Sequence, residues 1–185
     1  QFTTGVVVDE KLKLYTLKKL KKQIEFLRLE LQETQYIFDK ALTEFNRDFS
    51  DTLEKGKPLN VQKIQLTDQE EKECNILFRR IATVTHPDKL VNNSKIEEED
   101  KKKLEELYKQ SNDASEEGDY DTLVKVAGEL GFEDVTENEF YLEKSVSKLS
   151  EKIKHLQTTY AWVWYHEQNT DKKENLKQHI KRTYA

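Results

Sequence analysis

Residues 75–90 read NILFRRIATVTHPDKL, and this stretch decides the fold of the middle of the chain. Proline has no backbone N–H, and its ring disfavours helical conformation at the residue before it. The apolar residues that precede Pro87 recur with helical spacing, so the sequence predicts a helix that ends near Thr85. His86 and Asp88 are then expected on a loop, on either side of the proline.

The start of this helix is marked by Thr67 and Glu70, which have the spacing of a capping box. In a capping box, each side chain accepts a hydrogen bond from the backbone N–H of the other residue. The helical period places Arg79 on the exposed face, together with Lys72 and Thr83. The buried stripe of the helix is expected to contain Cys74, Leu77, Phe78, Ile81 and Val84.

Together these residues resemble the second helix and the following loop of a DnaJ-like J-domain. Residues 78–82, FRRIA, match the aromatic residue, two basic residues, aliphatic residue and alanine of that family, and HPDK follows at residues 86–89. Residues 108–114, YKQSNDA, resemble the third J-domain helix. A short helix closed by Gly131 resembles the last one. The resemblance covers residues 67–132.

The chain departs from the family pattern at three places. Val84 and Thr85 stand where the family tends to have lysine and tyrosine, and Ser111 replaces an aliphatic residue. No first J-domain helix with its tyrosine-leucine motif lies directly before Thr67. We therefore expect a helix from a flanking region to take its packing role.

The resemblance implies a co-chaperone. Such a protein docks on an ATP-driven DnaK-type chaperone of the seventy-kilodalton heat-shock class and stimulates ATP hydrolysis by that chaperone. It is not itself an enzyme and needs no cofactor or metal. By the resemblance, chaperone binding falls to residues His86, Pro87, Asp88, Arg79, Arg80 and Lys89.

Two heptad arrays flank this module. The first, at residues 9–56, has the seam Leu17, Leu20, Ile24, Leu27, Leu31, Thr34, Phe38, Ala41 and Phe45; the second, at residues 136–168, has Leu142, Val146, Leu149, Ile153, Leu156, Tyr160 and Val163. A short terminal helix is expected at residues 170–184. The sequence thus predicts an all-α protein with a J-domain-like module at the tip of an antiparallel coiled-coil hairpin. The aromatic residues near Trp162 should then lie beside Leu12–Leu20, by core packing or as a partner site. A parallel homodimer through the first array is the rival arrangement.

Capping residues set the expected ends of the helices. The first long helix should run from a cap at Asp9 to about Leu53 and be closed by Gly56 and Pro58. Ser94 with Glu97 and Thr136 with Glu139 have capping-box spacing. Gly118 should end one helix, and Asp119 and Thr170 should begin others.

Composition agrees with a helical, intracellular protein. The chain has 185 residues, of which 35% are hydrophobic and 36% charged, with only five glycines and two prolines. The net charge of −5 disfavours nucleic acid as a partner.

The single cysteine, Cys74, is expected to be a buried thiol. No run of about 20 apolar residues is present to span a membrane, so we expect a cytoplasmic protein. Gln1 in place of methionine is typical of a processed or trimmed chain.

Two other functions are compatible with the sequence. The chain could be a coiled-coil structural or assembly protein, viral ones included, whose J-like module is only a helical knob and whose coiled coil binds a client or assembly partner. Alternatively, His86 and Asp88 could serve a hydrolase or metal enzyme, although no nucleophile, base and acid or zinc-ligand spacing accompanies them. Stimulation of a chaperone ATPase separates the first reading from both alternatives.

Overall fold

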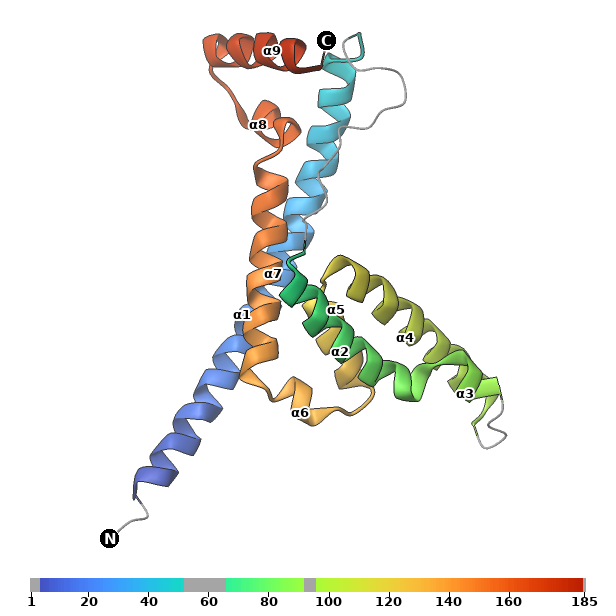
Figure 1. The fold of residues 1–185 in the computed structure, drawn as a ribbon. Coiled ribbons are helices and arrows are strands. Elements are labelled where there is room, and N and C mark those ends of the chain that lie inside the picture. The colour runs from blue at the N-terminus through green and yellow to red at the C-terminus, as the bar shows by residue number, and fades with distance from the viewer. Residues whose placement is uncertain (1–3, 52–65, 92–95, 185) are drawn as a thin grey trace. The chain divides into compact units, whose positions relative to one another are not determined.

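The computed structural model describes residues 4–51, 66–91 and 96–184, and the described residues contain helices and no strand. The predicted all-α class is therefore confirmed. By contacts the chain divides into two compact units, Gln1–Glu25 with Ile64–Leu149 and Phe26–Lys63 with Ser150–Ala185. The helices, labelled in Figure 1, are α1 (Thr4–Asp48), α2 (Asp68–Thr85), α3 (Pro87–Val91), α4 (Glu98–Glu117), α5 (Tyr120–Glu129), α6 (Glu133–Thr136), α7 (Glu139–Gln157), α8 (Tyr160–His166) and α9 (Thr170–Tyr184).

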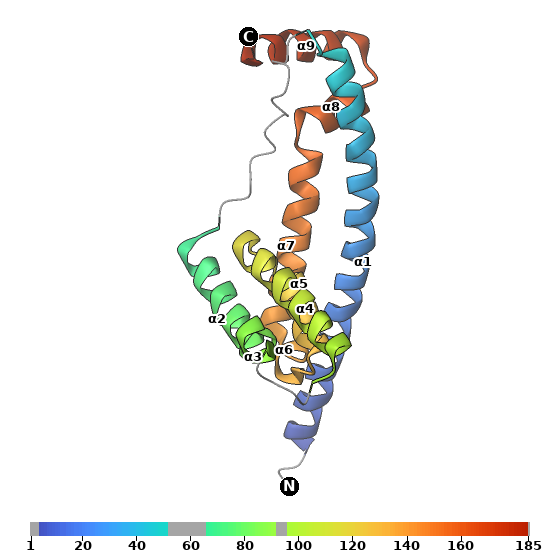
Figure 2. The same ribbon diagram turned by 90° about the vertical axis from the view of Figure 1, so that its right-hand side faces the viewer.

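Helices α2, α4 and α5 form the centre of the first unit (Figure 2). The Ser115 hydroxyl donates to the Asn75 side-chain oxygen at 3.3 Å, and the rings of Phe78 and Tyr108 lie 5.7 Å apart. Residue numbers therefore rise along α2 as they fall along α4, so the two helices are antiparallel. The buried apolar side chains of these three helices are Cys74, Leu77, Ile81, Leu107, Ala114, Tyr120, Leu123, Val124, Val126 and Ala127.

The buried stripe of α2 ends on Thr85 and not on Val84, which is 45% exposed. Eleven residues complete about three helical turns, so Thr85 continues the face that begins at Cys74. The Thr85 hydroxyl donates to the Ile81 carbonyl oxygen at 3.0 Å, and this bond satisfies the hydroxyl in its buried position. The prediction that Val84 is buried is wrong because it gave apolar character more weight than helical phase.

Several predicted helix ends are confirmed. Thr67 and Glu70 form the capping box, and the Asp119 carboxylate accepts from the Thr122 N–H at 3.2 Å at the start of α5. Gly118 follows α4 with a φ of 67°, in the left-handed region that favours glycine. After α5, Gly131 has a φ of 78°.

Other predicted ends are wrong by a few residues. Asn138 caps α7 by accepting from the Phe140 N–H at 3.0 Å, whereas Thr136 is the last residue of α6. Asn169 caps α9 by accepting from the Lys172 N–H at 3.0 Å, one residue before the predicted Thr170. Asparagine is as good a cap as threonine, so the pattern alone did not select between neighbours. Ser94 lies outside the described residues, and Glu97 precedes α4 without a side-chain capping bond.

Helix α1 begins at Thr4, so the predicted cap at Asp9 is wrong and position 9 lies within the helix. Valine has a low helix propensity, so the valines at positions 6–8 did not indicate that the helix begins before position 9. The helix ends at Asp48, followed by turns at residues 49–51; Leu53, Gly56 and Pro58 lie outside the described residues. The predicted seam side chains are buried or partly buried from Leu17 to Phe45.

The predicted single helix at residues 136–168 is interrupted. α7 stops at Gln157 and α8 starts at Tyr160. The hydroxyls of Thr158 and Thr159 donate to carbonyl oxygens in the last turn of α7, and the Thr159 hydroxyl also accepts from the Trp162 N–H at 3.3 Å. Two adjacent threonines thus compete with the helical backbone bonds and restart the chain in a new helix.

The second unit has an aromatic core at the end of α1. Trp164 lies edge-on to Phe49 with 4.9 Å between ring centroids, and its indole N–H donates to the Asp48 carboxylate at 3.1 Å. The aromatic residues of α8 therefore pack into a core, the first of the two predicted alternatives, with Trp162 and Tyr160 partly buried at its edge. The buried members of this cluster are Phe38, Phe45, Phe49, Leu156, Ala161, Trp164 and Ile180.

These contacts contradict the predicted neighbours of the aromatic cluster, because Trp164 lies beside the end of α1 and not beside Leu12–Leu20. In the first unit, Lys21 forms an ion pair with Glu137, just before α7. An antiparallel hairpin would instead pair the start of α7 with the end of α1. The prediction took the chain to reverse direction between the two arrays, but the 18 residues between Asp48 and Thr67 could span roughly 60 Å if extended. That length permits the chain to return to the first part of α1 before the second array begins.

Candidate functional site

His86 is the single residue between α2 and α3. Its backbone is extended, with φ −61° and ψ 129°, and its N–H donates to the Ala82 carbonyl oxygen at 3.1 Å. The extended conformation is the one that a residue before proline prefers. The proline therefore ends α2 where the sequence predicts, and it turns the chain at the imidazole.

Pro87 and Asp88 lie in the short helix α3 and not on a loop, so this detail of the prediction is wrong. Proline suits the first position of a helix because the N–H that it lacks would have no helical partner there. The Asp88 N–H donates to His86 Nδ1 at 3.3 Å, and the Lys89 N–H donates to the His86 carbonyl oxygen at 3.0 Å. The tripeptide is thus held in one local geometry.

The polar groups of the tripeptide face outward. The Asp88 side chain is 89% exposed and the His86 side chain 40% exposed, with 3.8 Å between Nδ1 and Oδ2. One edge of the imidazole packs against Tyr108, with 5.2 Å between ring centroids and 76° between ring planes. A neutral imidazole that accepts at Nδ1 carries its proton on Nε2. His86 can therefore donate to a partner, and Asp88 can accept.

Buried neighbours anchor this segment on both sides. Thr85 is fully buried before it and Leu90 is 2% exposed after it. The Lys89 ammonium donates to the Thr83 carbonyl oxygen at 2.8 Å, near the end of α2. A cation at this end of a helix satisfies a carbonyl that has no helical partner. Lys89 therefore holds α3 against α2.

The two adjacent arginines of α2 have different surroundings. Arg80 donates two hydrogen bonds to the Asp134 carboxylate, one of them 2.6 Å from Nη2 to Oδ1, and its guanidinium lies 4.6 Å from the centroid of the Phe132 ring. The Arg80 bond holds the pKa of Asp134 below its ordinary value. Arg79 is exposed and has no ion pair with any residue in the described part of the chain. Of the two, Arg79 is the more available to a partner.

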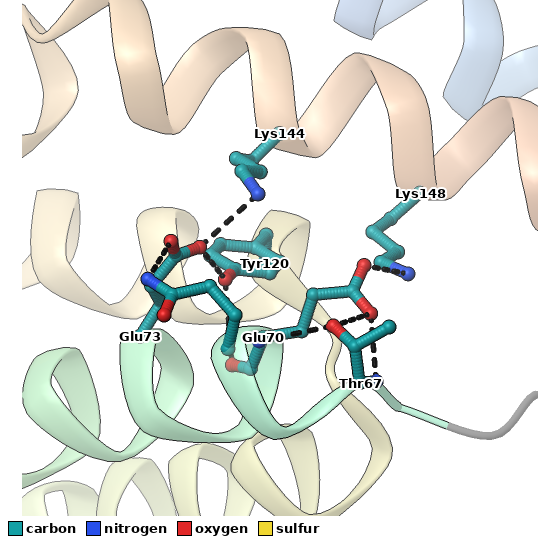
Figure 3. A network of polar contacts seen from close by, with 7 residues as sticks. Thr67, Glu70, Glu73, Tyr120, Lys144 and Lys148 are labelled. Carbon is teal, nitrogen blue, oxygen red and sulfur yellow. Dashed lines mark hydrogen bonds and ion pairs between the residues drawn. The ribbon is translucent and has the colours of Figure 1, made fainter.

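A polar network that the sequence analysis missed positions α2 (Figure 3). Lys148 of α7 pairs with Glu70 at 2.6 Å, and Lys144 pairs with Glu73 at 3.1 Å. The Tyr120 hydroxyl of α5 donates to the same Glu73 carboxylate at 2.7 Å. The network fastens three helices together. Its signal in the sequence is a pair of acids three residues apart on one helix and a pair of lysines four residues apart on another.

The charges of this network are stabilised where they lie. The hydrogen bond from Lys148, with those from Thr67, holds the pKa of Glu70 at about 2, below its ordinary 4.5. Burial, together with the bond to Glu73, raises the pKa of Tyr120 well above its ordinary value. Glu70 thus joins the capping box of α2 to α7 in a single carboxylate, which fixes the start of the helix that carries the site.

Nothing in the described part of the chain adds a metal centre to this site, since no three His, Cys, Asp or Glu side chains are grouped there to hold an ion. In the same part of the chain, no helix has both the length and the apolarity to cross a membrane. Cys74 is buried, as predicted, and burial raises the pKa of its thiol.

Comparison of the chain with protein-family models, with curated proteins and with solved structures finds no match.

Proposed function

We propose that this protein is a J-domain-like co-chaperone that docks on a DnaK-type ATP-driven chaperone of the seventy-kilodalton class and stimulates its ATPase. The single observation that carries the proposal is the exposed His86-Pro87-Asp88 segment at the end of an antiparallel helix pair. The aromatic residues of the J-domain resemblance, Phe78 and Tyr108, pack on each other beneath it. The proposed site therefore combines a rigid base with exposed polar groups.

The chemistry of this site suits binding and not catalysis by the protein itself. The Asp88 carboxylate would accept charge-assisted bonds from basic groups of the chaperone, which are about twice as strong as neutral ones. His86 would donate from Nε2, and the exposed Arg79 would orient the complex by charge. Arg80 and Lys89 would have to exchange their bonds to Asp134 and Thr83 for chaperone contacts. We therefore rank these two below the other four residues.

Helix α7 makes polar contacts with α2, and the family's first J-domain helix is missing from the sequence before Thr67. Lys144 and Lys148 of α7 pair with Glu73 and Glu70 at the start of α2. In this proposal α7 takes the place of that helix from the C-terminal side of the module. The proposed compartment is the cytoplasm, where an ATP-driven chaperone and a reduced Cys74 would both be found.

The test is a single-turnover ATPase assay on a DnaK-type chaperone with and without the full chain. The wild type should accelerate hydrolysis, and Asp88→Asn and His86→Gln should each abolish the acceleration, because they remove the proposed acceptor and donor. Helicity and melting temperature should stay nearly unchanged, since exposed groups contribute little to packing. Asp113→Asn, at an exposed position of α4, is the matched control. Full stimulation by a folded Asp88→Asn protein would refute the site.

Charge steering by Arg79 gives a second readout. Arg79→Ala should reduce stimulation partly and make the remainder less sensitive to salt, because exposed charges act through screened attraction. Lys72→Ala, on the same exposed face of α2 but farther from His86, should change stimulation less. An unaltered salt dependence would assign Arg79 to solubility.

A structural or assembly function is the second candidate, and one observation favours it. Large apolar side chains of α1 are exposed, among them Phe26 and Leu29 at 63% and 66%. Such residues suit a partner surface. If the chaperone ATPase does not respond to the wild-type chain, this candidate replaces the first.

A further inference from the structure

Helix α1 carries a second apolar stripe besides its buried seam. Five large side chains with exposed fractions from 58% to 66% recur along it with spacings that fit a repeat of alternating three and four residues. Single exposed apolar residues are ordinary on a protein surface, but five on one stripe of one helix are not. The stripe residues are Leu12, Tyr15, Phe26, Leu29 and Tyr36.

The stripe is continuous when its polar positions are included. Lys19, Lys22, Glu33 and Lys40 fill the remaining places of the same repeat. At 100° per residue, the stripe lies roughly 150° around the helix from the buried seam. One face of α1 is therefore covered by its own chain, and the opposite face has the pattern of a helix–helix interface.

We propose that this stripe binds a second copy of the chain, with the two α1 helices antiparallel and in the register in which facing residue numbers add up to 55. In this register Phe26 faces Leu29 of the second copy, and Lys22 faces Glu33. Lys19 faces Tyr36 in the same way. The layers between residues 15 and 40 then join apolar groups, opposite charges, or a lysine and an aromatic ring, and Leu12 faces Thr43.

Charge selects this arrangement over the alternatives. Lysines dominate α1 up to Lys22, and acids, from Glu25 to Glu44, are frequent after it. Antiparallel pairing brings the basic half of one helix beside the acidic half of the other. A parallel pair would instead place Lys19 and Lys22 against their own copies. The next antiparallel register, with a sum of 48, would place Lys22 against Phe26.

The contacts within one chain are compatible with this pairing. Lys22 forms an ion pair with Glu25 at 2.7 Å, and Lys40 lies 4.3 Å from the centroid of the Tyr36 ring. The Lys40 side chain therefore already lies along the stripe, and the Lys22 side chain reaches a residue beside it. Exposed pairs of this kind contribute little to stability, so they exchange readily for contacts with a second copy. The proposal rests on α1 and does not depend on chaperone binding.

The test is sedimentation equilibrium of the full chain with charge-reversal variants. The wild type should be a dimer at micromolar concentration. Lys22→Glu and Glu33→Lys should each raise the dissociation constant at least about tenfold, because each creates two like-charge layers per dimer. The double variant should restore the wild-type value, because it regenerates opposite charges in every affected layer. Lys172→Glu and Glu174→Lys, at exposed positions of α9, should have no effect.

Distances between spin labels separate the two directions. Cysteines introduced singly at Gln23 and at Thr43 can be labelled because the native Cys74 is buried. The antiparallel register predicts an axial offset between copies of roughly 15 Å at residue 23 and roughly 45 Å at residue 43, from the rise of 1.5 Å per residue. A monomeric wild type, a double variant that stays dissociated, or short distances at both positions would overturn the proposal.

Discussion

At the scale of single residues, the charge of Glu70 stabilises the contact between α2 and α7. Its carboxylate accepts from Thr67 and pairs with Lys148, and its pKa is lowered to about 2 from an ordinary 4.5. Because the folded-state pKa is the lower one, the stabilisation is complete above pH 4.5 and is lost as the pH falls toward 2. The side chain is 18% exposed, so its charge is only partly screened.

We predict that Glu70→Gln lowers the free energy of unfolding at pH 7 by on the order of 2 kcal/mol. Glutamine retains the capping box, so the change reports on the charge paired with Lys148. The variant should also lose part of the pH dependence of stability between pH 4.5 and 2. Urea unfolding across this range measures both effects, with Glu71→Gln, exposed on the same helix, as control. Equal losses in the two variants would show that the Lys148 pair contributes nothing.

The residues of the candidate site differ in how far the sequence predicts them. Pro87 sets the end of α2 through local sterics, so the sequence alone predicts that the helix ends at Thr85 and that His86 follows it. The partners of Arg80 do not. Asp134 lies 54 residues away, and the packing of α6 on α5 and of α5 on α2 brings it to the guanidinium. Contacts of this kind depend on tertiary structure, for which the sequence gives no local signal.

At the scale of helices, the junction between α4 and α5 depends on Gly118. Its φ of 67° is costly for any residue with a Cβ, and a Cβ there would also collide with the Leu66 side chain. Gly131 has a similar φ of 78° but has no atom within 4 Å of such a Cβ. The two glycines therefore separate backbone strain from steric collision.

We predict that Gly131→Ala lowers the free energy of unfolding by about 1 kcal/mol, from backbone strain alone. Gly118→Ala should lower it by at least about 1 kcal/mol more, because the Leu66 side chain must also move. Chemical denaturation followed by circular dichroism compares the two variants directly. Similar losses would mean that Leu66 relaxes without cost.

Some features of the helices could be predicted from local sequence patterns, and others could not. The heptad seam of α1 and the boundaries around Gly118 were predictable because spacing and capping are local properties. The direction of the second array was not, because it depends on the connection after Asp48 and on the core around Trp164. The interruption at Thr158 and Thr159 was missed because apolar spacing continues across it, as far as Tyr160.

At the scale of the whole molecule, two compact units share the helices α1 and α7, since each helix contributes residues to both. Both tryptophans, Trp162 and Trp164, belong to the second unit. Their fluorescence therefore reports on that unit, whereas far-ultraviolet circular dichroism reports on all helices. This separation of signals makes the coupling between the units measurable.

We predict that the two signals give coincident unfolding transitions. If the first unit unfolded alone, half of α1 and most of α7 would lose the partners of their buried side chains, such as Leu17 and Leu142. A helix deprived of its packed face is marginal in water, so the loss would spread along both shared helices. Gly118→Ala, a change in the first unit, should accordingly shift the tryptophan transition of the second unit to lower denaturant, by the same amount as the circular dichroism transition. A fluorescence midpoint that stays at the wild-type value would show that the units unfold independently.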